Sequence, residues 1–315
     1  MNNLEIIHEA KRILTAESEA ISNFKYKIDD NFINSVISIS KCTGKVFVSG
    51  VGKSGIIARK ISATFSSLGS PSINIDPLGA LHGDLGMIDK NDMIILISNS
   101  GETNELIEML SVLKRNKNLI ISITNNREST LAKASTFNIN SHCDIEANEE
   151  GLIPTCSTTT TLAIGDALGL TVAKYKKFKF SDFARVHPSG KIGKNLYRKV
   201  EEVMIKDNLP LCDEDTKIEK IIILIEKCSL GSAFILSNNK LKGIITDGDI
   251  RRQYKKSIKK ETIAKDIMNT KPKYVFYNDQ AYAAIDIMMS NKINILPVLK
   301  YDKVVGAIQM YNIKN

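Results

Sequence analysis

The chain opens with two segments, 4–24 and 30–42, in which apolar residues recur every three or four positions. This spacing predicts two amphipathic helices. From residue 45 the pattern changes to short apolar runs that end in Gly, Ser, Asp or Thr, at 45–50, 71–76, 92–98 and 118–124. Segments with helical character separate them at 54–68, 104–115 and 129–135, and a long one follows at about 157–174. Alternating strands and helices predict an α/β fold with a mainly parallel sheet covered on both faces.

The chain beyond residue 200 contains an internal repeat with a period of 63–64 residues. Met204 matches Met268 in the second copy, and Gly243 matches Gly306. Each copy has the pattern of a short strand, a helix, two strands joined by a turn, and a second helix. Two copies of a unit that cannot bury its apolar faces alone are expected to pack against each other. We therefore predict three parts, 1–200, 201–258 and 259–315, with a linker at 255–262 between the copies.

Length and composition exclude several classes of protein. The 315 residues suffice for about two domains, and 43% apolar with 25% charged residues is ordinary for a globular chain. No apolar run approaches the roughly 18 residues of a membrane span, and the first residues lack the apolar core of a secretory signal. Five scattered cysteines without a CxxC pair indicate reduced thiols. We expect a soluble, cytoplasmic protein with no membrane partner.

The positive charge is concentrated in one segment. Residues 174–199 contain seven Lys and two Arg against one Asp, which accounts for the whole net charge of +8. Nucleic-acid binding would also call for a base-contacting element, such as a helix-turn-helix, and the segment shows no such pattern. A small phosphorylated ligand or a solvated linker explains the segment better than a polynucleotide does.

The first motif that suggests a functional site is SGVGKSG at 49–55, between a predicted strand and a predicted helix. A Walker loop is excluded because Phe47 stands where its first Gly would be. The dinucleotide fingerprint GxGxxG fits Gly50, Gly52 and Gly55, and Asp76 lies about where a ribose-binding acid would stand. A plain Gly-rich turn between strand and helix is the competing interpretation.

The second motif, SNSGETNE at 98–105, also follows a strand and opens a helix. Ser98, Ser100 and Thr103, together with free backbone N–H groups and the positive helix end, can hold one phosphate monoester. A dinucleotide enzyme has no need of a second such loop, whereas a phosphosugar enzyme does. The competing interpretation is a simple cluster of helix-capping residues.

Five motifs in order and spacing resemble the sugar isomerase (SIS) domain of arabinose-5-phosphate isomerases. They are GVGKSGIIARKISATFSSLG, LGALHGDLGMI, SNSGETNEL, EEGLIPTCSTTTTLAIGDAL and FARVHPSGKIGKNL, and the tail with TDGDIRR resembles the paired CBS domains of that family. The resemblance implies an αβα sandwich with a five-stranded parallel sheet and a homotetramer. It also implies interconversion of D-ribulose 5-phosphate and D-arabinose 5-phosphate for the synthesis of Kdo, a sugar of lipopolysaccharides and some capsules.

The resemblance assigns the residues of the site. Aldose–ketose isomerisation moves a proton between two carbons through an enediol and requires neither a redox cofactor nor a metal. Matching the motifs gives Lys53, Glu105, Glu146 and His187 as catalytic candidates, with Glu146 and His187 as the proton-transfer groups. The expected substrate- and phosphate-binding residues are Gly52, Ser54, His82, Ser98, Ser100 and Thr103.

Three of these assignments have open alternatives. Glu149 and Glu150 lie close enough that a small shift would exchange them with Glu146. His82 is a substrate contact, a structural residue or the ligand of an inhibitory metal. HPSGKIG differs from the expected HPGGALG at Ser189 and Lys191, which leaves the His but adds a charge.

The tail offers a second site. Thr246 and Asp249 have the Thr-x-x-Asp spacing of adenosine-binding CBS units, whereas the second copy has Gln309 and Asn312 at these places. We therefore expect at most one good nucleotide site, in the first CBS unit, or a tail that serves assembly alone. Two alternatives remain for the whole chain, a non-catalytic phosphosugar sensor and a dinucleotide oxidoreductase. Four ionisable residues disfavour the sensor, because binding alone does not need them.

Overall fold

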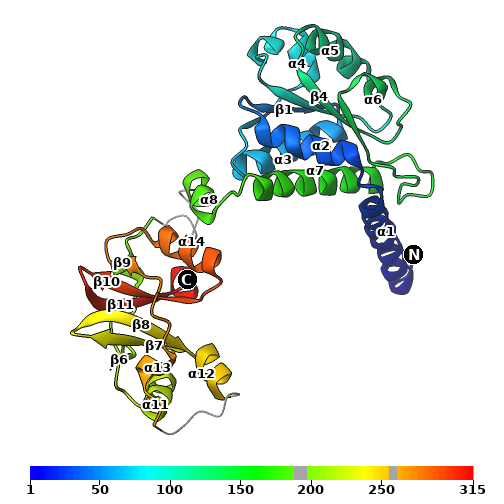
Figure 1. The fold of residues 1–315 in the computed structure, drawn as a ribbon. Coiled ribbons are helices and arrows are strands. Elements are labelled where there is room, and N and C mark those ends of the chain that lie inside the picture. Colours follow the sequence, from blue (N-terminus) through cyan, green and yellow to red (C-terminus); the bar gives the residue numbers. More distant parts are fainter. Residues whose placement is uncertain (188–196, 255–260, 315) are drawn as a thin grey trace. The chain divides into compact units, whose positions relative to one another are not determined.

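The computed structural model describes residues 1–187, 197–254 and 261–314. The chain divides into two compact units, unit 1 (residues 1–178) and unit 2 (residues 179–315), which are described separately (Figure 1). The limits predicted from the sequence, 1–200, 201–258 and 259–315, stay a prediction.

Unit 1 is an α/β sandwich around one sheet of five parallel strands in the order β2-β1-β3-β4-β5. The strands are β1 (Val46–Gly50), β2 (Ser72–Asn74), β3 (Met93–Ile97), β4 (Leu119–Thr124) and β5 (Phe137–Asn140). The helices are α1 (Asn3–Phe24), η1 (Lys25–Lys27), α2 (Asp30–Lys41), α3 (Lys53–Ser67), α4 (Pro77–Leu81), η2 (Asp84–Met87), α5 (Asn104–Arg115), α6 (Thr130–Ala134) and α7 (Cys156–Tyr175). The predicted fold class and its five-stranded sheet are confirmed.

The central strands are mainly apolar because both faces of the sheet are covered. In β1, Val46 and Val48 face a core built with α2, α3 and α7, whereas Phe47 faces a second core built with α4, α5 and α6. The same alternation places Ile95 of β3 in the first core and Ile94 in the second. Continuous apolar runs in the sequence therefore mark the buried middle of the sheet.

The edge strand β5 escaped the pattern analysis because its residues alternate, in the order Phe-Asn-Ile-Asn. Its two amides bond within the sheet edge. The Asn138 Nδ2 donates to the hydroxyls of Ser122 and Thr124, each at 2.9 Å, and the Asn140 Nδ2 donates to the carbonyl of Asn125 at 3.0 Å. Polar side chains thus serve a strand whose outer side carries no neighbouring strand among the described residues.

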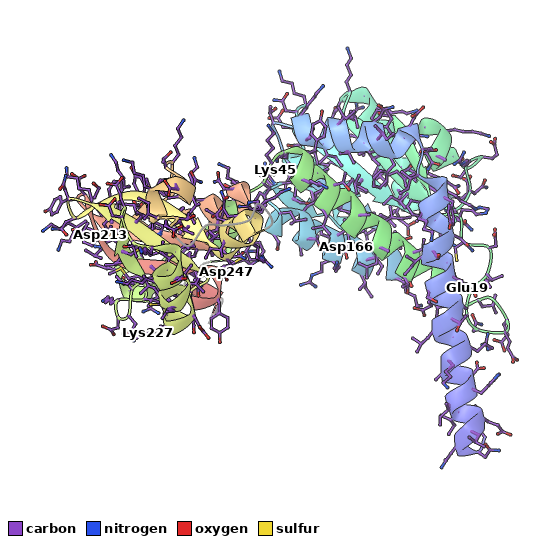
Figure 2. The ribbon with its side chains drawn as sticks, turned by 60° about the horizontal axis from the view of Figure 1, so that its bottom comes forward. Glu19, Lys45, Asp166, Asp213, Lys227 and Asp247 are labelled. Atoms are coloured by element: carbon purple, nitrogen blue, oxygen red, sulfur yellow. The ribbon has the colours of Figure 1, made fainter. Side chains whose placement is uncertain are left out.

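Helix α1 packs on α7 only along its second half. Ile13, Ala16 and Ala20 lie on a small core with Cys143 and Cys156, and the Thr159 hydroxyl donates to Glu17 at 2.9 Å. Its first two turns extend past the body of unit 1 and leave Leu4, Ile6 and Ile7 exposed (Figure 2).

Unit 2 opens with α8 (Phe180–Val186) and then repeats one arrangement twice. The first copy has α10 (Val200–Val203), β6 (Leu211–Asp213), α11 (Ile218–Cys228), β7 (Ser232–Ser237), β8 (Lys240–Thr246) and α12 (Asp247–Tyr254). The second has α13 (Ala264–Ile267), β9 (Val275–Phe276), α14 (Ala281–Asn291), β10 (Ile295–Lys300), β11 (Lys303–Gln309) and α15 (Met310–Lys314). Each copy forms a three-stranded sheet, β6-β7-β8 or β9-β10-β11, with a parallel and an antiparallel pair.

The two copies interlock by exchanging their first segments. A Cβ on Gly243 of the first copy would lie 2.6 Å from the Met268 sulfur of the second, and a Cβ on Gly306 would lie 2.6 Å from the Met204 sulfur. The Ile205 and Ala307 backbones form the matching bridge across the two copies. The matched Met and Gly positions of the sequence repeat are therefore two reciprocal contacts, which explains why the copies cannot pack separately.

The close approach of α7 to α3 gives a stability prediction. A Cβ on Gly165 would lie 2.3 Å from the Ile61 Cδ1 and 2.4 Å from its Cγ1, and Ile61 is fully buried in the first core. We expect Gly165→Ala to lower the free energy of unfolding by about 1–3 kcal/mol through overpacking. Gly169→Ala is the matched control on the same helix, because its Cβ would meet Leu68 at an ordinary 3.4 Å. That variant should gain up to about 1 kcal/mol from helix propensity. Urea unfolding measures both, and equal effects would contradict the packing argument.

Candidate functional site

The site lies at the carboxyl ends of β1 and β3. The strand order runs outward from β1 to β2 on one side and through β3 to β5 on the other. Open parallel sheets bind ligands in the crevice at such a switch point. The loop after β1 and the loop after β3 meet there with the start of α7, and they enclose a cavity of about 220 Å³.

The glycines of the first loop have packing and turn roles. A Cβ on Gly55 would lie 2.7 Å from the carbonyl oxygen of Gly50, so these two glycines let α3 approach β1. Gly52 has a φ of +58° and is the residue from which α3 starts. Lys53 and Ser54 follow in the first turn and line the cavity. The positive end of α3 and the Lys53 ammonium thus favour an anion at this point.

Asp76 does not act as a free ribose acceptor in this arrangement. It caps α4, and its Oδ2 accepts from the Gly79 N–H at 3.0 Å. The fingerprint therefore matches a tight strand-to-helix turn and not a dinucleotide site.

The second loop is closed by its own hydroxyls. The Ser98 side chain is buried, its Oγ lies 2.7 Å from the Thr103 Oγ1, and it accepts from the Gly101 N–H at 3.0 Å. Ser100 is exposed, and its Oγ accepts from the Glu102 N–H at 3.2 Å. Ser98 and Thr103 thus hold the loop in shape, and Ser100 presents its hydroxyl at the surface of the loop.

Glu102, which was not predicted from the sequence, ties this loop to α6. The Glu102 Oε1 accepts from the Thr130 N–H at 2.8 Å, and the Gly101 carbonyl accepts from the Leu131 N–H at 3.1 Å. Gly101 has a φ of +72°, and a Cβ there would overlap Ser129. Although Glu102 is exposed, the hydrogen bond from Thr130 lowers the pKa of its carboxyl below the ordinary value. The second loop is therefore fixed to the neighbouring strand end.

The third wall of the cavity is the start of α7, and Glu146 caps it. The Glu146 Oε2 accepts from the Thr155 N–H at 2.8 Å, the Thr155 hydroxyl at 3.1 Å and the Ser157 N–H at 3.2 Å. The Ser157 side chain is 3% exposed, lines the cavity, and its Oγ has no hydrogen-bond partner among the described residues. Ser157 was missed because the TCSTTTT run has the appearance of ordinary helix. Its orphaned hydroxyl is a signal that only the folded chain provides.

The remaining site candidates are spread more widely. Glu105 is half-buried in the first turn of α5, and His82 is exposed where α4 ends. His187 follows α8 in unit 2, where its ring stacks on Phe183 at 4.0 Å and its Nδ1 lies 3.1 Å from the Phe183 carbonyl oxygen. Unit 1 therefore brings Lys53, Ser54 and Ser157 together and joins Glu146 to them through α7. Ser189 and Lys191 lie outside the described residues.

The cysteines near the site are held as thiols. Burial raises the pKa of the Cys143 thiol to about 11 and also raises the pKa of the Cys156 thiol. Over the described ranges, no group of three or more His, Cys, Asp or Glu side chains is placed to hold a metal ion. Within the same ranges, no helix is long and apolar enough to cross a membrane.

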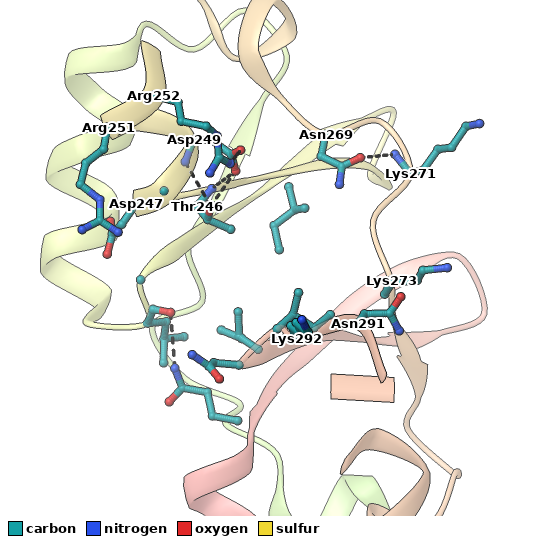
Figure 3. A pocket seen from close by; sticks show the side chains of 18 of the residues that line it. Thr246, Asp247, Asp249, Arg251, Arg252, Asn269, Lys271, Lys273, Asn291 and Lys292 are labelled. Carbon is teal, nitrogen blue, oxygen red and sulfur yellow. Dashed lines mark hydrogen bonds and ion pairs between the residues drawn. The ribbon is translucent and has the colours of Figure 1, made fainter. Parts of the chain in front are cut away.

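Unit 2 has its own cavity of about 800 Å³ between the two copies (Figure 3). Thr246, Asp249 and Arg252 lie together on one wall. The Asp249 Oδ2 accepts from the Thr246 hydroxyl at 2.6 Å and from its N–H at 2.9 Å, and Oδ1 pairs with Arg252. Desolvation works against ionisation, but these bonds outweigh it and lower the pKa of Asp249. Gln309 of the second copy lines the same cavity without a carboxylate.

The domain comparisons define the class of protein. Residues 38–171 match the SIS domain, and residues 200–256 and 264–314 match the CBS domain. The chain is thus a SIS-domain protein with a CBS pair.

Full-length relatives narrow the class. The chain is 38% identical over 315 residues to "Arabinose 5-phosphate isomerase KdsD" of Pseudomonas aeruginosa, covering 99% of this chain and 97% of that protein. It is also 38% identical to "Arabinose 5-phosphate isomerase KpsF" of Escherichia coli O6:H1, with 98% and 95% covered. The solved structure of an E. coli CFT073 protein in complex with arabinose 5-phosphate is 43% identical over 60% of this chain and all of that one, with a TM-score of 0.58. The chain belongs to the arabinose 5-phosphate isomerase family.

Proposed function

We propose that this protein interconverts D-ribulose 5-phosphate and D-arabinose 5-phosphate by proton transfer through an enediol. The observation that carries the proposal is the cavity at the β1–β3 crevice, which Lys53 and Ser54 of the α3 start line together with Asn99 of the second loop. Ser157, whose buried hydroxyl is orphaned, lines it at the start of α7, which Glu146 caps. The names of the relatives support the same substrate class.

The phosphate is assigned to the second loop. Ser100 offers an exposed hydroxyl, and Ser98 and Thr103 hold the loop in shape through their mutual hydrogen bond and the bond from the Gly101 N–H to Ser98. The start of α5, which follows this loop, favours an anion. Lys53 and Ser54 of the first loop line the cavity, and we assign them to the same ligand together with Gly52, from which α3 starts. The sugar chain then extends toward Ser157, which supplies a hydroxyl that has no partner among the described residues.

Proton transfer is assigned to Glu146 and His187. A base removes the C2 proton of the aldose while the C1 carbonyl oxygen gains a proton, which forms the enediol. Loss of the O2 proton and protonation at C1 then give the ketose, so atoms and charge balance. Lys53 stabilises the negative charge that develops on oxygen, and His187 serves ring opening or the proton relay. Glu105 and His82 remain proposed contacts near the substrate.

The finer setting of the reaction is proposed from the family resemblance. It includes supply of Kdo synthesis, a homotetrameric assembly and a cytoplasmic location. For the tail we propose one nucleotide site, at Thr246 and Asp249. Its support is the cavity of unit 2 and the Thr-x-x-Asp geometry that holds an ionised carboxylate ready for ribose hydroxyls.

The reaction is tested by proton NMR of the purified protein with D-arabinose 5-phosphate in D₂O, without added metal or cofactor. We expect ribulose 5-phosphate to appear with deuterium at C1 or C2, because the transferred proton exchanges with solvent on the base. A sample without protein is the control. Ligand-induced shifts without turnover would contradict the isomerase and support the phosphosugar sensor, and absence of binding would contradict both.

The substitution Glu146→Gln separates the proposed catalytic role of Glu146 from its capping role. The amide oxygen can still accept from the Thr155 and Ser157 N–H groups, so we expect a folded protein with an intact start of α7. Loss of the base should lower kcat by about 10²–10⁴-fold. Glu149→Gln is the matched control, because Glu149 is exposed in the same loop. Near-native turnover of Glu146→Gln, or an equal loss in the control, would contradict the assignment.

The nucleotide site is tested by calorimetric titration with adenosine monophosphate. We expect the full chain to bind it and Asp249→Ala to weaken binding by about 10–100-fold, which corresponds to a lost hydrogen bond to a charged group. Asp302→Ala is the control, because this carboxylate pairs with Lys240 on an exposed hairpin. No heat with the unaltered chain, or equal affinity in Asp249→Ala, would leave the tail with an assembly role only.

A further inference from the structure

Asn125, the first residue after β4, makes three short hydrogen bonds to two different loops. Its backbone N–H donates to the Asn99 carbonyl at 2.9 Å. Its side-chain Oδ1 accepts from the Cys143 N–H at 2.7 Å, and its Nδ2 donates to the Cys143 carbonyl at 2.8 Å. A backbone N–H only donates and a carbonyl only accepts, so the orientation of this amide is fixed.

Both of the loops that Asn125 joins lead to the proposed site. Asn99, which stands between Ser98 and Ser100 in the second loop, lines the cavity. Cys143 begins the segment that carries Glu146 three residues later and ends at the start of α7. One residue therefore lies between the phosphate-binding side and the proton-transfer side.

The Glu146 segment has few other attachments to the sheet. Upstream of Cys143, the Ser141 N–H donates to the Thr124 carbonyl at 2.8 Å. Downstream, the Ala147 carbonyl accepts from Arg12 of α1 at 2.6 Å, which leads away from the sheet. Among the described residues, the bonds from the Asn125 side chain to Cys143 are thus the last hydrogen bonds that attach the chain to the sheet end before Glu146. Cys143 is 8% exposed, so its backbone groups would lack water if the amide were removed.

We propose that Asn125 is a positioning residue that sets the spacing between the phosphate-binding loop and the Glu146 carboxylate. The inference rests on the proposed isomerase, because it acts through the base assigned there. The hydrogen bonds of Asn125 to the two loops respond differently to substitution. The bond to Asn99 uses the backbone and survives any substitution except Pro, whereas both bonds to Cys143 use the side chain.

Because one loop is held by the backbone and the other by the side chain, substitution of Asn125 should change kcat without changing phosphate binding. In Asn125→Ala the phosphate-binding loop keeps its support, so the inhibition constant for inorganic phosphate should stay unchanged. The Glu146 segment loses its register, and kcat should fall by up to about 10²-fold, as expected when a catalytic group is misplaced by about an ångström. A role in general stability would lower the melting temperature and weaken phosphate binding together.

Asn125→Asp adds a readout that a structural role would not move. The ionised carboxylate can still accept from the Cys143 N–H but opposes its carbonyl, whereas the protonated form can donate to that carbonyl as the amide does. The ratio of variant to unaltered kcat should therefore rise as the pH falls from about 8 toward 5, in the direction of the ordinary carboxyl pKa of about 4. The neighbouring Asn126 gives the matched control variants, Asn126→Ala and Asn126→Asp.

Hydrogen exchange measured by mass spectrometry on the full chain tests the same idea without activity. Asn125→Ala should speed exchange over 141–157 and leave 98–103 unchanged, and Asn126→Ala should change neither segment. Unaltered exchange over 141–157 would overturn the proposal, as would unaltered kcat in a chain that isomerises. If the unaltered chain shows no turnover, the isomerase proposal fails, and the exchange result still decides whether Asn125 sets the loop spacing.

Discussion

Burial of β1, β3 and β4 on both faces is the constraint on which unit 1 depends. Residues such as Phe47, Ile94 and Ile95 have no exposed surface. Ser49 of β1 and Ser122 of β4 are buried as well, and their hydroxyls bond to neighbouring segments of the sheet. Polar groups that can reach a ligand are therefore found where the strands end. Because the strands are parallel, those ends share one edge of the sheet. The parallel arrangement alone therefore brings together the loops after β1, β3 and β4.

The loops at that edge are held by hydrogen bonds that leave some groups free for a ligand. Ser98 and Thr103 bond to each other, Glu102 bonds to the start of α6, and Glu146 bonds to the start of α7. The side chains of Ser98, Glu102 and Glu146 thereby satisfy backbone donors that a helix start or tight loop would otherwise leave open. The exposed Ser100 and the orphaned Ser157 hydroxyl stay available. Loop stability and ligand binding are thus divided between different residues.

Unit 2 depends on a different constraint, because neither of its three-stranded sheets can bury both faces alone. The Gly243–Met268 and Gly306–Met204 contacts place the first segment of each copy on the hairpin of the other. Phe234, Ile295 and Ala307 then form a shared core between the copies. The cavity beside Thr246 and Asp249 arises at this junction, so a ligand there touches both copies at once.

The central strands, the long helices and the repeat follow from the amino-acid pattern alone. Continuous apolar runs place β1, β3 and β4 within one residue at each boundary, because most positions of a strand buried on both faces are apolar. The same pattern puts the two Gly- and Ser-rich loops at strand ends. Residue types alone could not say which hydroxyl of the second loop would be buried and which exposed.

The partners of Asp76, Glu102, Asn125 and Glu146 were settled by the folded chain and not by its pattern. Asp76 has the position of a ribose acceptor in the sequence, yet it caps α4. Asn125 lies 26 residues from Asn99 and 18 from Cys143, and it joins them because β3, β4 and β5 are neighbours in the sheet. A local pattern reports whether a residue is buried or polar. Which distant backbone group its side chain meets depends on strand order and loop path, and these are fixed only when the cores close.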